Sequence, residues 1–167
     1  MTLTHLDEQG YARMVDVTDK ADTVRRAVAY GEIHAEVATV QKIANNTIAK
    51  GSVLSVAQIA GIGAAKRTGE LIPLCHPIPL THVGIAFSLD PTQGCIRIKA
   101  TATATGKTGV EMEALTAVTV AALTIYDMCK AIDRAMSVGS IFLIEKTGGK
   151  SGRFIRPGWE SSDTWPS

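Results

Sequence analysis

Cysteine, aromatic residues and net charge are all scarce in this sequence, and each scarcity excludes a class of protein. The three cysteines form no C-x-x-C pair, which argues against a disulfide scaffold and is typical of a reducing cytoplasm. Lys and Arg number 17 against 16 Asp and Glu, so the net charge of +1 gives no general attraction to nucleic acid or membranes. Any positively charged site must therefore be local.

Long hydrophobic runs are missing as well. The longest, from Ala114 to Tyr126, is too short to span a bilayer and has acidic residues near both ends. Residues 1–8 lack the basic and apolar regions of a signal peptide. The hydrophobic content of 46% suffices for the core of one compact domain. We expect a cytoplasmic protein with a single α+β domain over residues 1–152 and a mobile tail over residues 153–167.

One long helix is predicted between Gly106 and Lys130, and the rest of the chain is organised around it. Thr108 precedes Glu111 by three positions, the spacing of a capping box, which predicts a helix start near Gly109. The helix is apolar on all sides, so both sides must be covered. One side can pack on the chain's own sheet, and we expect a second subunit to cover the other.

Two carboxylates of this helix, Glu113 and Asp127, lie 14 residues apart. At the rise of an α-helix this separation is about 21 Å, which is too far for one short reaction centre. If a second subunit covers the helix, both carboxylates lie along a subunit interface.

The other elements follow from periodicity and turn residues. Alternation over 23–33 predicts a strand with Val24, Arg26, Val28 and Tyr30 on one face and Arg25 on the other. Further elements are predicted as strands at 14–17 and 138–144, helices at 36–48 and 53–68, and a hairpin over 83–98. This order favours an α+β ferredoxin-like plait, an antiparallel sheet with helices packed on one face and an N-terminal strand addition.

The glycine-rich segment at Gly149–Ser151 is not a Walker loop, because Ile144 stands where that motif needs glycine and no helix follows. Successive glycine N–H groups beside Lys146 and Lys150 suit a looser phosphate-binding nest. A flexible turn carrying solvated lysines is the alternative.

The loop 72–79 holds three prolines, which make it stiff and extended. Within it, Cys75 and His76 are adjacent, and adjacent residues seldom bind one ion, so no metal site is predicted. His76 either lies at a cleft as a hydrogen-bonding or proton-transfer group, or is an ordinary loop histidine.

Asp127 and Lys130 are neighbours on the helix surface and form either an ordinary ion pair or a half-buried pair whose titration is shifted toward neutral pH. Glu111 is needed for the capping box, whereas Glu113 is available to accept two hydrogen bonds from an amino–N–H edge such as that of guanine or a pterin. Positive charge for phosphates is available from Arg25, Lys50, Lys66, Lys146 and Lys150.

Several strings resemble those of the molybdenum cofactor biosynthesis protein C family, the cyclic pyranopterin monophosphate synthases. The similarity extends from about Met14 to Gly152, in the family's order. The strings are Met14-Val15-Asp16-Val17, Leu74-Cys75-His76-Pro77, Lys107-Thr108-Gly109-Val110-Glu111-Met112-Glu113-Ala114-Leu115-Thr116, Asp127-Met128-Cys129-Lys130-Ala131 and Gly148-Gly149-Lys150-Ser151-Gly152.

The resemblance implies a phosphorus–oxygen lyase. Its subunits have a ferredoxin-like fold and form a hexamer built from dimers, with active sites at the dimer interface. The substrate would be 3′,8-cyclo-7,8-dihydroguanosine 5′-triphosphate, and the products cyclic pyranopterin monophosphate and pyrophosphate. No cofactor is required by the sequence, although Mg²⁺ can accompany the triphosphate.

The resemblance also assigns roles to residues. It implies that Asp127 and Lys130 are catalytic, and we expect them to carry proton transfers while His76 and Glu113 orient the ring. The substrate-binding residues are expected to be Arg25, Lys50, Lys66, Leu74, Cys75, His76, Glu111, Met112, Glu113, Lys146 and Lys150, the lysines neutralising the pyrophosphate.

Two other classes of protein remain to be separated from this enzyme. An RNA-binding plait needs aromatic platforms and a basic sheet face, yet only Phe87 and Phe142 lie in the predicted central strands. A non-catalytic oligomeric nucleotide-binding sensor would need the basic pocket but has little use for Asp127 and Lys130.

Overall fold

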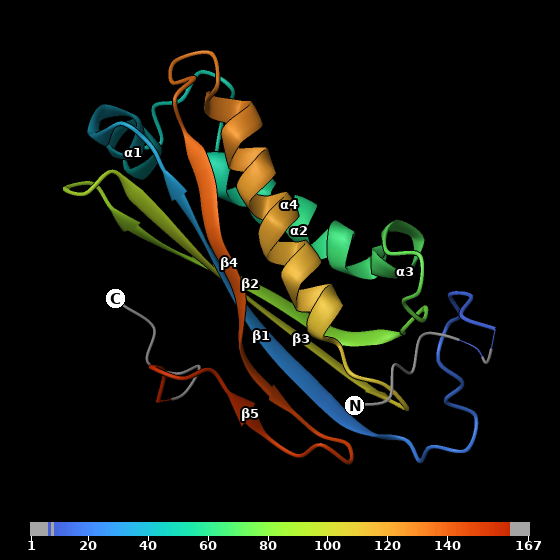
Figure 1. Cartoon of the computed structure of the whole chain (residues 1–167). Coiled ribbons are helices and arrows are strands. Elements are labelled where there is room, and N and C mark those ends of the chain that lie inside the picture. The colour runs from blue at the N-terminus through green and yellow to red at the C-terminus, as the bar shows by residue number, and fades with distance from the viewer. Residues whose placement is uncertain (1–6, 8, 161–167) are drawn as a thin grey trace.

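The computed structural model describes residue 7 and residues 9–160 of the 167-residue chain. It contains both strands and helices, with three successive helices between the first two strands (Figure 1). In chain order they are β1 Thr23–His34, α1 Val37–Ala44, α2 Val53–Lys66, α3 Thr68–Leu71, β2 Leu80–Asp90, β3 Cys95–Gly106, α4 Glu111–Cys129, β4 Ser137–Thr147 and β5 Phe154–Ile155.

The strands form one antiparallel sheet in the order β2-β3-β1-β4-β5. Helices α2 and α4 lie side by side across one face of this sheet (Figure 1). Without β5, the strand order and the two helical crossovers are those of a ferredoxin-like plait, so the predicted fold class is confirmed.

Strand β1 separates two hydrophobic layers because its side chains alternate between the faces of the sheet. Ala27, Ala29 and Ile33 are buried toward the helices in the main core. Val28 and Tyr30 pack on the opposite face in a smaller cluster. The predicted alternation of this strand is therefore confirmed.

Helix α4 packs closely on its neighbours because small residues line the contact. Ala117 and Ala121 are fully buried, and Gly61 of α2 lies directly against them. A Cβ atom on Gly61 would lie 2.8 Å from the Ala117 carbonyl oxygen and 2.3 Å from Ile85 Cδ1. Glycine at position 61 thus sets the distance between the two helices.

By length and composition α4 could also cross a membrane, since its 19 residues have a hydropathy of 1.3. However, 56% of the 18-residue apolar stretch within α4 is buried inside the structure. Core helices of globular proteins share these properties, so the burial of α4 explains its apolar character.

Two predictions of local structure are wrong. Residues 13–17 form no strand, because the carbonyl oxygen of Val15 is bonded by the His76 ring instead of a neighbouring strand. The capping box is absent, because α4 begins at Glu111 with Val110 as N-cap and no side-chain cap bond. The predicted helices at 36–48 and 53–68 also end earlier, at Ala44 and Lys66.

The segment after residue 152, placed by the sequence in a mobile tail, contacts the sheet as far as it is described. Strand β5 pairs with Glu145 and Lys146 of β4, and Arg153 Nε lies 2.8 Å from Glu145 Oε1. The Trp159 ring lies 5.4 Å from that of Tyr30. The extra strand of this plait is therefore C-terminal, and residues 161–167 lie outside the described residues.

We predict opposite effects for alanine at two glycines of α2. Gly61→Ala should lower the free energy of unfolding by about 1–3 kcal/mol, because its methyl group meets a backbone oxygen that cannot rotate away. Gly63, the matched control, has no atom within 4 Å of the added Cβ, so Gly63→Ala should raise stability by about 0.4–1 kcal/mol. Urea unfolding of both variants measures the difference, and equal effects would contradict the close approach.

Candidate active site

The predicted site residues gather at the two ends of α4. Glu111 and Glu113 stand in its first turn, beside the proline-rich loop 72–79, whereas Asp127 and Lys130 stand at its last turn. The 14 residues between Glu113 and Asp127 correspond to about 21 Å along the helix. One chain therefore presents two separate groups of site residues.

At the first end, the carboxyl group of Glu113 is buried, with only 3% of the residue exposed. It lines a pocket of about 390 Å³ together with Cys75 and His76. Burial raises the pKa of Glu113 to about 7, and the charge of Glu111 acts in the same direction. Burial also raises the pKa of the Cys75 thiol. Glu113 is thus able to accept or donate a proton near neutral pH.

The ring of His76 is held by the N-terminal segment. Its Nε2 lies 2.8 Å from the carbonyl oxygen of Val15, so in the neutral ring Nε2 carries the proton and Nδ1 remains an acceptor. Leu74 and Met112 supply apolar walls to the same pocket. An apolar pocket with a carboxyl group and an imidazole suits a flat heterocycle.

A second pocket of about 600 Å³ adjoins the first, since Lys20, Thr108, Gly109 and Glu111 line both. It is strongly basic. Its cationic side chains are Lys20, Arg25, Lys107, Lys146 and Lys150, with Glu111 as the carboxylate among its lining residues.

The glycine-rich turn of this basic pocket rests on Arg25. The guanidinium donates hydrogen bonds to the carbonyl oxygens of Gly106 and Lys107, each at 3.3 Å. A Cβ atom on Gly149, whose φ is +75°, would lie 1.9 Å from Arg25 Nη1. Only glycine therefore allows the turn to approach the guanidinium, and this arrangement favours an anion site over an unstructured turn.

Glu111 contributes to the basic pocket through an ion pair, with its Oε1 at 2.9 Å from Lys146 Nζ. This contact takes the place of the predicted capping interaction. It also holds Lys146 of the basic pocket beside Glu111, which lines both pockets.

At the other end of α4, Asp127 is surrounded by two lysines. Lys130 Nζ lies 2.7 Å from Oδ1, and Lys50 Nζ lies 3.7 Å from Oδ2 and donates to the Asp127 carbonyl oxygen. The hydrogen bond from Lys130 lowers the pKa of Asp127 and raises that of Lys130. The Asp127 side chain is 61% exposed, so the prediction of a half-buried pair titrating near neutral pH is wrong for the single chain.

Most of the predicted residues thus lie at the first end of α4. Lys66 lines a further pocket that also touches Glu113. The first group comprises Arg25, Lys66, Leu74, Cys75, His76, Glu111, Met112, Glu113, Lys146 and Lys150, and the second comprises Lys50, Asp127 and Lys130.

Sequence reasoning missed three contributors. Lys107 lines the basic pocket and donates a hydrogen bond to the carbonyl oxygen of Thr18. Its position in a string that resembles the family could have identified it as a site residue. Lys20 lines both pockets from an ordinary polar turn that carries no signal. Val15 acts through its backbone, which residue identity does not reveal.

Curated relatives are similar over nearly the whole chain. The chain is 60% identical over 153 residues to the cyclic pyranopterin monophosphate synthase of Roseiflexus sp. (strain RS-1), covering 92% of this chain and 97% of the relative. It is 60% identical over 156 residues to the protein of the same name from Thermoanaerobacter sp. (strain X514), covering 93% and 99%. The one from Heliobacterium modesticaldum (strain ATCC 51547 / Ice1) is 60% identical over 154 residues, covering 92% and 97%.

A family model agrees with these relatives. Residues 14–149 match the model described as the MoaC family. This range includes both groups of site residues except Lys150, which follows it directly. The chain belongs to the MoaC family.

Proposed function

We propose that this chain converts 3′,8-cyclo-7,8-dihydroguanosine 5′-triphosphate to cyclic pyranopterin monophosphate, releasing pyrophosphate, as a step of molybdenum cofactor biosynthesis. The name shared by its relatives supports this reaction. The structural observation that carries the proposal is the adjoining pair of pockets, one with a buried carboxyl group and one with five cations. A heterocycle joined to a polyphosphate fits that pair, with the ring in the first pocket and the phosphates in the second.

The buried carboxyl group of Glu113 is placed to hold the heterocycle. A guanine-derived or pterin ring presents an amino group beside a ring N–H, and a carboxylate accepts hydrogen bonds from both. His76 can bond the ring from the other wall through Nδ1. Because the pKa of Glu113 is raised to about 7, binding of the ring to the carboxylate is coupled to release of the Glu113 proton.

The cations of the basic pocket neutralise the triphosphate and the departing pyrophosphate. The reaction rearranges a ring and closes a cyclic phosphate without net oxidation, so acid–base groups suffice and no redox cofactor is required. A Mg²⁺ ion bound to the triphosphate enters as part of the substrate.

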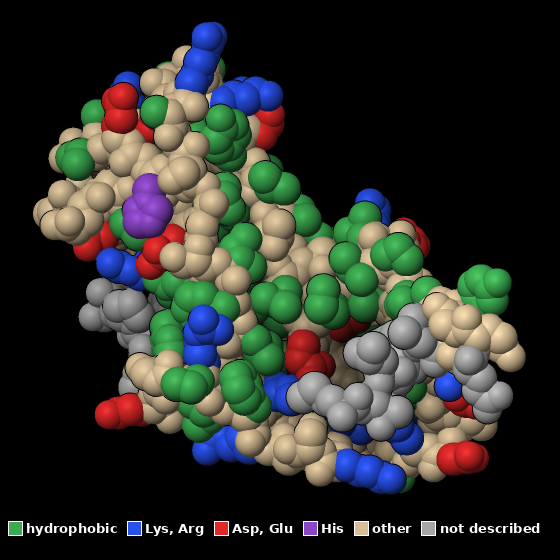
Figure 2. Space-filling model, viewed as in Figure 1, with side chains coloured by type: hydrophobic (Ala, Val, Ile, Leu, Met, Phe, Trp, Pro, Cys, Tyr) green, Lys and Arg blue, Asp and Glu red, His purple; other side chains and the backbone are tan. Residues whose placement is uncertain are grey.

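Asp127, Lys130 and Lys50 reach the substrate in this proposal from a second copy of the chain. The helical face away from the sheet exposes large apolar side chains, among them Ile59 at 72% and Leu123 at 54%. Figure 2 shows hydrophobic side chains gathered over this part of the molecule. Such a patch marks an interaction surface, and its burial in a dimer, repeated in a hexamer, places the second group of one chain against the pockets of another.

The alternatives fit less well. An RNA-binding plait would display aromatic rings on the open sheet face, but Phe142 stacks on Tyr30 and is covered by Trp159 and Arg156. A nucleotide sensor would bind the substrate without releasing pyrophosphate. We place the reaction in the cytoplasm.

The first experiment is turnover of the cyclised GTP derivative by the purified chain. We expect one pyrophosphate released for each cyclic pyranopterin monophosphate formed. Tight binding with no pyrophosphate would favour the sensor. Arg25→Ala should raise KM at least tenfold because it removes the support of the glycine-rich turn and one positive charge from the polyphosphate pocket.

Mixing two inactive variants tests whether the site is shared between subunits. In a two-fold dimer, combining Asp127→Ala with His76→Ala chains leaves one intact site in each mixed dimer, so random mixing should restore about one quarter of wild-type activity. Asp127→Ala mixed with Lys130→Ala is the control, because both changes affect the same end of α4. It should stay inactive. Failure of the first mixture to recover would mean that each site takes both residues from the same chain.

Glu113 predicts a pH dependence of stability. In the folded chain the Glu113 carboxyl group keeps its proton up to about pH 7, whereas the ordinary pKa of a glutamate side chain is 4.5. The contribution of Glu113 to the free energy of unfolding should therefore be largest below pH 4.5 and fall by on the order of 3 kcal/mol as pH rises to 7.

Glu113→Gln keeps the shape of the side chain and should remove this decline, making the variant more stable than the wild type at pH 8. Glu111→Gln, the control in the same helical turn, should retain most of it. Urea unfolding at a series of pH values measures both. A decline that persists unchanged in Glu113→Gln would show that another group causes it.

A further inference from the structure

A second cluster of reactive side chains lies away from the candidate active site, at the far end of β1. Glu32 and His34 of β1 and Cys95 of β3 each offer one ligand atom, and these three atoms lie within 4.8 Å of one another. None of the three lines the two pockets at the start of α4. The proposed reaction gives these residues no role.

Strand pairing brings the three together. His34 lies directly opposite Cys95 in the β1–β3 ladder, and Glu32 precedes His34 by two residues on the same face. This is the face of the sheet that also carries Tyr30, away from the helices. The residues are distant in sequence, so no spacing motif announces them.

The distances suit a tetrahedral metal ion. His34 Nε2 and Glu32 Oε2 are 3.1 Å apart, close to the separation of about 3.3 Å between nitrogen and oxygen ligands of zinc. The Cys95 sulfur lies within 4.8 Å of a ligand atom of each of the other two residues. Cys95 is buried, whereas His34 is 54% exposed and gives an ion a path from solvent.

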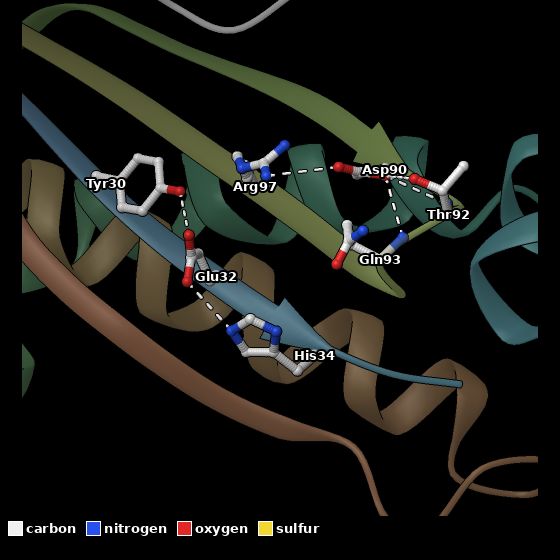
Figure 3. A network of polar contacts seen from close by, with 7 residues as sticks. All are labelled: Tyr30, Glu32, His34, Asp90, Thr92, Gln93 and Arg97. Atoms are coloured by element: carbon white, nitrogen blue, oxygen red, sulfur yellow. Dashed lines mark hydrogen bonds and ion pairs between the residues drawn. The ribbon is translucent and has the colours of Figure 1, made fainter. Parts of the chain in front are cut away.

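Neighbouring groups orient the carboxylate (Figure 3). The Tyr30 hydroxyl donates to Glu32 Oε1, which leaves Oε2 directed at His34. Arg97, the nearby cation, is paired with Asp90 at 3.6 Å. Asp90 is held in turn by Thr92 and the Gln93 N–H. Hydrogen bonds to ligating groups are typical of metal sites.

We propose that Glu32, His34 and Cys95 form a binding site for a borderline divalent cation, Zn²⁺ in preference to Mg²⁺ or Ca²⁺, with its fourth position open to water. A thiolate with an imidazole selects Zn²⁺, Co²⁺ and Ni²⁺, whereas the hard cations take oxygen ligands only. The ion links the end of β1 to the start of β3. It therefore stabilises the sheet and takes no part in the proposed reaction.

Binding at this site must displace a proton. Burial and the charge of Glu32 raise the pKa of the Cys95 thiol, Asp90 acts in the same direction, and Arg97 opposes them. Metal binding releases the thiol proton, so affinity falls as pH falls.

The test uses the full chain after removal of metals with a chelator. Co²⁺ is the probe, because its thiolate complexes absorb strongly through ligand-to-metal charge transfer. We expect one Co²⁺ for each chain, with a thiolate band that Zn²⁺ abolishes by displacement and excess Mg²⁺ leaves unchanged. Cys95→Ser should lose the band, and Tyr30→Phe should weaken binding about 10–100-fold because it removes the hydrogen bond to the ligating carboxylate.

Cys75→Ser is the matched control and should keep the band, since Cys75 belongs to the other site. His34→Ala changes an exposed side chain, so it should fold normally, bind Co²⁺ at least tenfold more weakly, and lose the rise in Tm that Zn²⁺ gives the wild type. Its pyrophosphate release should be unchanged. A wild type without the thiolate band, or a band lost in Cys75→Ser and kept in Cys95→Ser, would overturn the proposal.

Discussion

The close packing of α4 on the sheet and on α2 is the constraint on which the rest of this structure depends. Ala117 and Ala121 are fully buried, and Gly61 brings α2 so near that a methyl group would strike the α4 backbone. The helix is consequently fixed along its length. Its first turn holds Glu113 over the pockets, and its last turn holds Asp127 at the opposite end. The apolar packing of α4 therefore determines where each group of polar side chains lies.

The sequence predicted what local patterns encode. Alternation gave the faces of β1, and the turn at Asp90–Gly94 gave the β2–β3 hairpin. The failures share one physical cause, which is competition for a partner that only the folded chain identifies. Glu111 has the spacing of a capping residue, yet Lys146 of β4 pairs with it. Val15 lies in an alternating stretch, yet a histidine side chain bonds its backbone.

The sequence predicted which residues belong to the candidate site better than it predicted where they lie in the fold. Family-like strings identified the residues at both ends of α4, and helix geometry alone separated them. The sequence did not predict the exposure of the Asp127 side chain, because its apolar neighbours in the sequence do not bury it within one chain. The Glu32, His34 and Cys95 cluster makes the same point, since its members meet only through strand register. Distances across a sheet have no signature in sequence spacing.

The two carboxylic acids of α4 have opposite electrostatic surroundings, and this contrast fits a shared site. Glu113 is buried, which raises its pKa to about 7, whereas the nearby Lys130 lowers the pKa of Asp127. Enzymes separate the roles of two acids by such differences in environment. In the proposed dimer a second chain covers Asp127 and removes water from it, which opposes the lowering of its pKa by Lys130. Assembly would then set the acid–base chemistry at one end of α4, while folding of the single chain sets it at the other.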